Sequence, residues 1–174
     1  MMSLISSNII LPTITVAIST IAVNMGRFLN NFPFESLRDA DEVLIIIQGI
    51  LDYKPMEFSN KYTIIEDNGK GVSRSRNTGL LHANCDYIWF MDDDIQLNND
   101  AIITVKNYIL KYNADIFTVR MQNFDSDVPY KHYPNKHTLD RGDIMHISTV
   151  EIIVSRGFIL KSKVRFNESL GLGT

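Results

Sequence analysis

Apolar, strand-like runs alternate along this chain with segments of helical spacing. The runs are rich in β-branched and aromatic residues, which is typical of buried strands. The segments between them place apolar side chains three and four residues apart, which is typical of helices. This alternation predicts an α/β fold with a mixed, mainly parallel sheet flanked by helices. The predicted strands are residues 14–20, 42–47, 62–65, 87–91 and 114–121, and the predicted helices are residues 24–32, 73–84 and 98–112.

The pattern changes after residue 121. Residues 122–143 mix Asp, Pro, Tyr, His and Lys without periodicity, which predicts a long loop. Residues 144–154 return to strand-like sequence, and residues 156–163 predict a short helix. No linker divides the chain, so we take residues 1–174 as one domain. Its last residues, 164–174, resemble a loop that leads onward, and we expect the domain to be truncated there.

Composition and charge argue against several classes of protein. Hydrophobic residues make up 45% and charged residues 21% of the chain, as in ordinary globular proteins. The net charge of −3 argues against a general nucleic-acid binder, which needs a basic surface. The single cysteine, Cys85, rules out a disulfide within this sequence and agrees with a reducing compartment. Residues 9–23 are too short a stretch for a membrane span, and no Lys or Arg precedes Arg27, as a signal peptide would require.

Three aspartates directly follow the apolar run 87–91. In a parallel sheet, ligands bind beyond the carboxyl ends of the strands. Adjacent carboxylates repel one another unless a cation lies among them, and oxygen ligands favour Mg²⁺ or Mn²⁺. In an extended segment Asp92 and Asp94 point to one side and Asp93 to the other, so Asp92 and Asp94 are the candidate metal ligands. The alternative is a solvated acidic turn before the next helix.

A basic stretch precedes this strand by about one helix. Lys70, Arg74 and Arg76 place three cations within seven residues, near the predicted start of a helix. Such an arrangement can bind a diphosphate. The alternative is an ordinary basic helix face. The stretch is not a P-loop, because the Gly-Lys-Ser/Thr ending is absent.

Together these segments resemble a known family. The run Gly71-Val-Ser-Arg-Ser-Arg-Asn-Thr-Gly-Leu80, then Ala83, then Asp86-Tyr-Ile-Trp-Phe-Met-Asp-Asp-Asp94 is similar to family 2 glycosyltransferases of the GT-A fold. Those enzymes carry an Arg-Asn-x-Gly helix followed by a hydrophobic strand that ends in the "DxD" carboxylates. Residues 16–20 resemble the family's first strand. Residues 151–153, and residues 166–168 with 171–173, resemble its later strand and its acceptor-side loop.

The resemblance implies a GT-A, Rossmann-like domain that binds a nucleotide-diphosphate sugar and Mn²⁺ or Mg²⁺. The implied reaction is metal-dependent transfer of the sugar, with inversion, to a glycan or lipid-linked acceptor. We expect a cytoplasmic location, with peripheral attachment at the inner face of a membrane as the other possibility. The residues implied for nucleotide-sugar binding are Ser19, Thr20, Gln48, Arg74, Arg76, Asp92 and Asp93, and those implied for the metal are Asp92 and Asp94.

The end of the second strand departs from the family pattern. Many relatives place there an aspartate that reads uracil, whereas this chain has Gln48 followed by Gly49. The amide of Gln48 can still hydrogen-bond the edge of a base. UDP is therefore the default nucleotide, and dTDP and GDP remain open.

The general base that transfer requires is not evident in the sequence. In relatives it is an Asp or Glu beyond the Gly-Leu-Gly loop, and this sequence stops at Thr174. Glu151 and Glu168 are the remaining candidates, with a paired charge at a strand start and a turn residue as the plainer interpretations. Tyr133 and its neighbour Tyr130 are candidates for stacking on an acceptor sugar, or they merely cover the loop.

Three other functions compete with sugar transfer. A nucleotide-sugar-binding module without transferase activity is the alternative that fits this sequence. A phosphoryl-transfer or receiver-type domain would place acidic residues at the end of the first strand, where Ser19 and Thr20 stand. A nucleotidyltransferase would place a Gly-rich, Lys-containing loop there. His132, His137 and His146 match no usual spacing of metal ligands, so loop histidines are the plainer interpretation.

Overall fold

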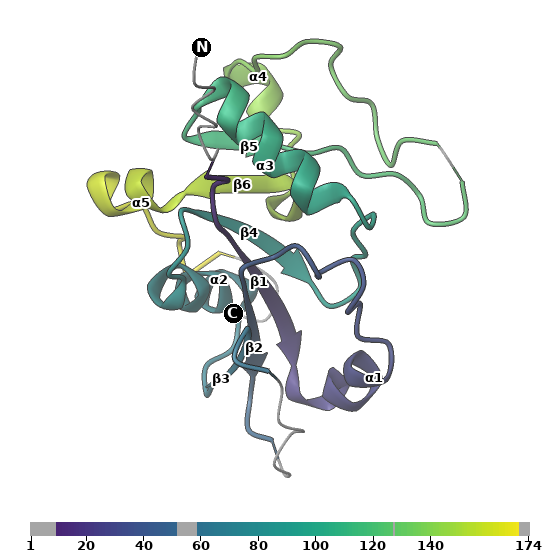
Figure 1. The fold of residues 1–174 in the computed structure, drawn as a ribbon. Helices are drawn as coiled ribbons and strands as arrows, with labels where there is room; N and C mark the ends of the chain where they lie inside the picture. The colour runs from purple at the N-terminus through teal and green to yellow at the C-terminus, as the bar shows by residue number, and fades with distance from the viewer. Residues whose placement is uncertain (1–9, 52–58, 127, 171–174) are drawn as a thin grey trace, which may run out of the picture.

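The computed structural model describes residues 10–51, 59–126 and 128–170. Its centre is a single six-stranded sheet in the order β3-β2-β1-β4-β6-β5 (Figure 1). The first four strands in this order are parallel, and β6 runs antiparallel to both of its neighbours. The predicted mixed, mainly parallel sheet is therefore confirmed. The strands are β1 (Ile14–Ile21), β2 (Glu42–Gln48), β3 (Tyr62–Asp67), β4 (Tyr87–Asp92), β5 (Ile116–Thr118) and β6 (Ile152–Ser155).

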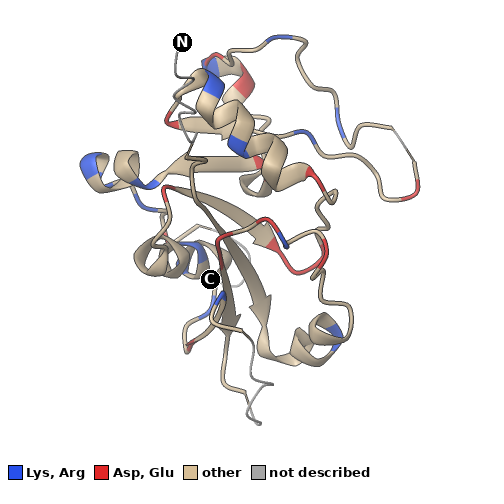
Figure 2. Cartoon of the chain, in the orientation of Figure 1, with Lys and Arg blue, Asp and Glu red and all other residues tan. Residues whose placement is uncertain are grey.

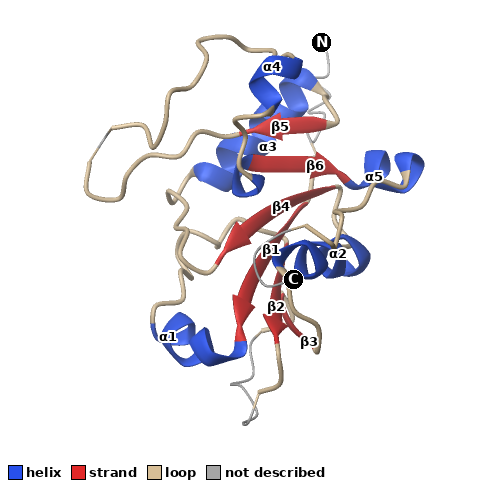
Figure 3. Ribbon diagram, turned by 180° about the vertical axis from the view of Figure 1, so that it is seen from behind, coloured by secondary structure: helices blue, strands red, loops and turns tan. Residues whose placement is uncertain are grey.

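Helices cover both faces of the sheet (Figure 3). The apolar sides of α1 and α3 pack on one face, and those of α2 and α5 pack on the other. No helix in the described ranges is long and apolar enough to cross a membrane. The helices are α1 (Met25–Asn30), α2 (Val72–His82), α3 (Ala101–Tyr112), α4 (Arg141–Ile144) and α5 (Arg156–Ser162), with short 3-10 turns η1 (Ala22–Asn24) and η2 (Thr149–Glu151).

Alternate side chains of the central strands divide between two cores. In β4, Trp89 faces the α1 and α3 side, whereas Phe90 faces the α2 and α5 side. Both side chains are almost fully buried, as expected for strands that are covered on both faces. Trp89 is thus a core residue, and its Nε1 donates a hydrogen bond to the carbonyl of Val150.

The structure corrects several predicted boundaries. The third strand continues through Asp67, two residues beyond its predicted end at residue 65. The strand expected at residues 114–121 is only Ile116–Thr118, because it lies at the sheet edge with one partner. The strand expected at residues 144–154 begins only at Ile152. Before it, capping boxes at Asp140 and Ser148 satisfy backbone N–H groups and stabilise helical turns instead.

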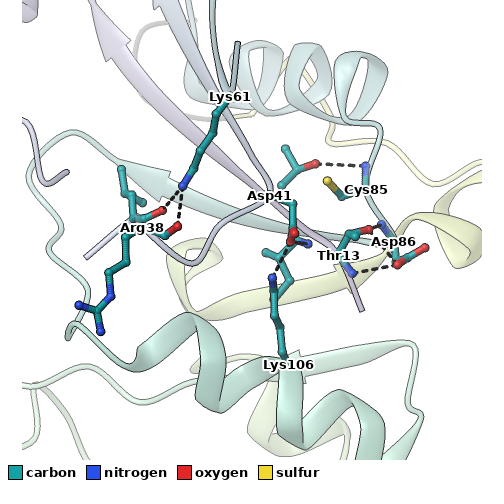
Figure 4. A network of polar contacts seen from close by, with 10 residues as sticks. Thr13, Arg38, Asp41, Lys61, Cys85, Asp86 and Lys106 are labelled. Atoms are coloured by element: carbon teal, nitrogen blue, oxygen red, sulfur yellow. Dashed lines mark hydrogen bonds and ion pairs between the residues drawn. The ribbon is translucent and has the colours of Figure 1, made fainter. Parts of the chain in front are cut away.

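Polar contacts tie the amino ends of the strands to the neighbouring segments (Figure 4). The backbone N–H and hydroxyl of Thr13 both donate to the Asp86 carboxylate, at 2.9 and 2.8 Å. Lys106 of α3 is buried and lies 2.7 Å from Asp41 just before β2. Cys85 lies half-buried in the same region, and burial raises the pKa of its thiol. This edge of the sheet therefore has a structural role, and it lies opposite the edge described next.

Candidate functional site at the carboxyl edge of the sheet

The carboxyl ends of the four parallel strands bring the predicted site residues to one edge. Ser19 of β1 lies directly beside Asp92 of β4 in the sheet register. On the other side of β1, Ile21 lies beside Gln48, and Gln48 lies beside Asp67 of β3. This is the edge at which parallel α/β sheets bind ligands, and its acidic stretch after β4 is visible in Figure 2.

Arg76 of α2 reaches over the sheet to Asp92. Its Nη2 lies 3.3 Å from Asp92 Oδ1, and only 13% of the Arg76 side chain is exposed. Burial lowers the pKa of Arg76. Burial also raises the pKa of the Asp92 carboxyl above its ordinary value, with Asp94 and Asp93 adding to the effect and Arg76 opposing it. Arg76 thus pairs with the first of three consecutive aspartates.

One polar atom at this site lacks a partner. Arg76 Nε is buried and has no hydrogen-bond acceptor within the described part of the chain. A buried donor without an acceptor is unfavourable by about 1–3 kcal/mol. The guanidinium consequently retains hydrogen-bonding capacity beside the carboxylates, where an anionic group of a ligand could be bound.

Asp93 and Asp94 lie in the turn after β4 rather than in an extended strand. The hydroxyl of Thr20 donates to Asp93 Oδ2 at 2.5 Å, and Asn24 Nδ2 lies 3.5 Å from the same oxygen. Both aspartates line a pocket against α1, whereas Asp92 faces Arg76. Because the strand ends at Asp92, strand alternation does not fix the side-chain directions of Asp93 and Asp94.

The basic stretch does not act as one cluster. Arg74 Nε lies 2.8 Å from Asp67, whereas Arg76 contacts Asp92, and Lys70 is exposed. Side chains two residues apart on a helix point about 200° away from each other around its axis. Arg74 and Arg76 therefore approach different strands. Burial would raise the pKa of Asp67, but hydrogen bonds from Arg74 and from its other donors outweigh burial and hold that pKa below its usual value.

Asp67 lies at this edge of the sheet and was not singled out from the sequence. The hydroxyl of Thr78 donates to its Oδ2, and the backbone N–H of Gly69 donates to its Oδ1. Next to it, Gln48 Oε1 accepts the backbone N–H of Gly71 at 2.9 Å. The Gln48 amide therefore presents its NH₂ group, a hydrogen-bond donor, as its remaining polar group. The sequence feature that could have indicated Asp67 is the acidic pair Glu66-Asp67 at the end of the third strand-like run.

Ser19 and Ser75 join the first strand to α2 below this edge. Both are buried, and the Ser75 hydroxyl donates to the Ser19 hydroxyl at 2.9 Å. Ser19 thus contacts the helix that carries Arg76, and Thr20 contacts the turn that carries Asp93. The predicted residues Ser19, Thr20, Arg76, Asp92 and Asp93 are therefore linked through contacts among β1, α2 and the end of β4.

The two candidate bases are held by other residues. Glu151 is 1% exposed, and its carboxylate accepts from the Ser148 backbone and from Tyr133 at 2.5 Å and pairs with Lys131 at 2.5 Å. Tyr133 therefore anchors the loop onto the sheet. Glu168 is exposed and accepts a hydrogen bond from Asn77 at 2.8 Å.

The aspartates after β4 are the candidate ligands for the metal that the family resemblance implies. Within the described ranges, no three His, Cys, Asp or Glu side chains converge as a ready-made cage, and the histidines form no such group. The oxygen ligands of the carboxylates at the end of β4 nevertheless fit Mg²⁺ or Mn²⁺. Such sites commonly use one or two carboxylates together with substrate phosphates rather than an all-protein cage.

Comparison with known proteins places the chain in a family. The model for glycosyl transferase family 2 matches residues 39–165. The chain belongs to glycosyltransferase family 2. The glycosyltransferase GlyA of Streptococcus pneumoniae serotype 4 is 32% identical over 69 residues, which cover 40% of this family 2 chain and 10% of GlyA.

Solved structures of TarS from S. aureus share the fold of this family 2 chain. The complex of TarS 1–349 with UDP matches with a TM-score of 0.70 and 16% identity, over 92% of this chain and 52% of TarS 1–349. The complex with UDP-GlcNAc matches with a TM-score of 0.70 and 17% identity, over 91% and 49%. The chain therefore spans about half of that TarS structure, and the likeness confirms the GT-A architecture.

Proposed function

We propose that this chain is the donor-binding part of a metal-dependent glycosyltransferase. It would transfer a sugar, with inversion, from a nucleotide-diphosphate sugar to a hydroxyl of a glycan or lipid-linked acceptor. UDP-sugars are the favoured donors. Family membership supports the reaction class, and the UDP and UDP-GlcNAc complexes of TarS support the choice of nucleotide.

The pairing of Arg76 with Asp92 is the observation that carries this proposal. A nucleotide diphosphate needs a cationic partner and hydrogen-bond donors, and the half-used Arg76 guanidinium offers both. The adjoining carboxylates suit a divalent cation that shares the same phosphates. One buried arginine and an acidic strand end thus lie close enough to bind opposite sides of one ligand.

Asp92 and Asp94 are the residues proposed to hold Mn²⁺ or Mg²⁺. When bound, the cation would neutralise charge on the leaving diphosphate. Asp93, fixed by the Thr20 hydroxyl, would orient the ribose, and Gln48 would offer its NH₂ group to the base. The role of the chain's own residues is to bind and align the donor, which makes the reaction effectively intramolecular.

A binding module without transferase activity is the second candidate. It is favoured by the contacts of the candidate bases: both Glu151 oxygens are engaged, and Glu168 is hydrogen-bonded to Asn77. A carboxylate in such contacts is poorly placed to accept the proton of an acceptor hydroxyl. Transfer or hydrolysis of a donor sugar by this chain would reject the module.

A thermal-shift panel tests the proposal. UDP, GDP and dTDP sugars are added to the protein with and without Mn²⁺. A ligand at about 100 times its Kd should stabilise the native state by roughly 2.7 kcal/mol, which raises Tm by about 5–10 °C for a domain of this size. We expect the largest rise for a UDP-sugar with Mn²⁺. No metal-dependent rise with any nucleotide sugar would refute the proposal.

The aspartates are tested by a double substitution, Asp92→Asn with Asp94→Asn. We expect the Mn²⁺-dependent rise in Tm to be lost while the protein still unfolds cooperatively. The control is Asp125→Asn on the exposed loop, which removes one carboxylate charge away from the cluster and should keep the full rise. Binding that survives the double substitution would exclude the proposed role of the cluster.

A further inference from the structure

A short segment after α5 runs back along α2 and is held there by hydrogen bonds. We call residues 164–170 the strap. Asn77 of α2 binds it with both ends of its amide: Nδ2 donates to the Phe166 carbonyl, and Oδ1 accepts the Phe166 N–H, each at 2.9 Å. Ser73, one turn earlier, donates to the Leu170 carbonyl at 2.6 Å. The strap is therefore fixed to the helix that carries Arg76.

These contacts place the Phe166 ring against the Arg76 side chain. The Arg76 guanidinium carbon lies 6.0 Å from the centre of the ring. The Phe166 ring itself is held in place, because it packs edge to face on buried Phe90 of β4, with centroids 5.3 Å apart. The Arg76 guanidinium thus contacts both the Phe166 ring and the Asp92 carboxylate.

Arg76 needs such support. An arginine side chain carries about 2 kcal/mol of rotamer entropy, and within the described residues its one hydrogen bond, to Asp92, is 3.3 Å long. An aromatic face attracts the guanidinium and restricts it to a plane. Phe90 packs against the Phe166 ring, and Asn77 hydrogen-bonds the Phe166 backbone. The position of the ring is therefore fixed from two sides.

We infer that Phe166, latched by Asn77, is a positioning residue that holds the Arg76 guanidinium ready for the donor diphosphate. This inference rests on the proposed function, in which Arg76 binds the nucleotide. It assigns to the amide of Asn77 the task of linking the strap to the donor-binding helix. A purely structural role for Phe166, as one more apolar side chain on this face, is the competing explanation.

A double-mutant cycle separates the two explanations. UDP binding with Mn²⁺ is measured by calorimetry for the wild type, Phe166→Leu, Arg76→Ala and the double variant. We expect Phe166→Leu to weaken UDP binding about three- to tenfold, the range of a partly desolvated cation–π contact. In the Arg76→Ala background the same change should alter affinity less than about twofold.

Matched variants control for folding. Phe158→Leu makes the same truncation on the same apolar face, and we expect it to lower Tm by a similar amount and leave UDP affinity unchanged. Phe166→Tyr keeps the ring and should keep the affinity. Asn77→Ala should weaken UDP binding as Phe166→Leu does, without adding to it in the combined variant.

Each outcome decides between the proposals. Equal loss from Phe166→Leu in both backgrounds, or an equal loss from Phe158→Leu, overturns the positioning role and leaves the proposed function intact. If Arg76→Ala binds UDP as tightly as the wild type, Arg76 is not a donor residue, and the inference fails with that part of the proposed function. A wild type that binds none of UDP, GDP and dTDP sugars in the presence of Mn²⁺ overturns both.

Discussion

Gly79 lies where α2 packs closely on the sheet, and its replacement by alanine tests how tightly that helix packs there. A Cβ atom there would lie 3.1 Å from the Ala17 Cβ and 3.2 Å from Ile46 Cδ1. Carbon atoms pack best at about 3.5–4.0 Å, so the added methyl group is too close by a few tenths of an ångström. Ile46 can rotate, but the Ala17 Cβ is fixed to β1, which is paired on both sides.

Two opposing effects set the size of the change. Alanine is favoured over glycine in a helix interior by about 1 kcal/mol. Overpacking of a buried site is unfavourable by about 1–3 kcal/mol. We therefore expect Gly79→Ala to lower the free energy of unfolding by about 1 kcal/mol. Gly26→Ala in α1 is the matched control, because a Cβ there meets nothing within 4 Å, and it should raise stability by up to about 1 kcal/mol.

Urea denaturation followed by circular dichroism measures both variants. A change in midpoint at constant slope reports stability alone, and the two variants should differ by about 2 kcal/mol. Gly79→Ala should also weaken UDP binding, because a helix displaced outward carries Arg76 with it, whereas Gly26→Ala should not. The reasoning is refuted if Gly79→Ala stabilises the protein as much as Gly26→Ala does.

Three further predictions concern stability. Lys163 ends α5 in the left-handed conformation, with φ of 57°, so Lys163→Gly should raise the free energy of unfolding by about 0.5–1 kcal/mol in urea titrations; a loss would contradict this. Burial and the hydrogen bond to Glu151 raise the pKa of Tyr133 to about 12, above the unfolded value of about 10. The native state therefore holds this proton more tightly, and its contribution, complete below about pH 10, is lost as pH rises toward 12; Tyr133→Phe should flatten that decline, and an unchanged slope would count against it. Trp89→Phe removes the hydrogen bond to the Val150 carbonyl and buried volume, so calorimetry should show a loss of about 2–4 kcal/mol, and a change under about 0.5 kcal/mol would contradict it.

Much of the fold could be predicted from residue type and spacing. The central strands are runs of β-branched and aromatic residues, and these are poorly suited to other buried structures. The helix over Ala101–Tyr112 follows from its apolar spacing. The short edge strands and the turns before β6 were predicted less well, because capping hydrogen bonds and the lack of a second strand partner decide them.

The candidate site was also predicted only in part. The position of Asp92 followed from the sequence, because an apolar strand runs directly into it and strand ends of a parallel sheet meet at one edge. The assignment of Arg74 to the donor did not anticipate Asp67, its partner in the structure. Residues 74 and 76 are separated by about 200° around a helix, which already indicates that the two arginines have different partners. The order of the strands beneath α2 was needed to identify those partners.

The sequence alone thus determined the family, the parallel core and the edge at which ligands should bind, because these depend on local periodicity and short motifs. Tertiary structure decided which charges meet. Arg76 faces Asp92, Glu151 is enclosed by the loop residues Lys131 and Tyr133, and Asn77 binds a strap 89 residues further along the chain. Contacts of such long sequence separation depend on how helices and loops pack over the sheet, and no local pattern encodes that packing.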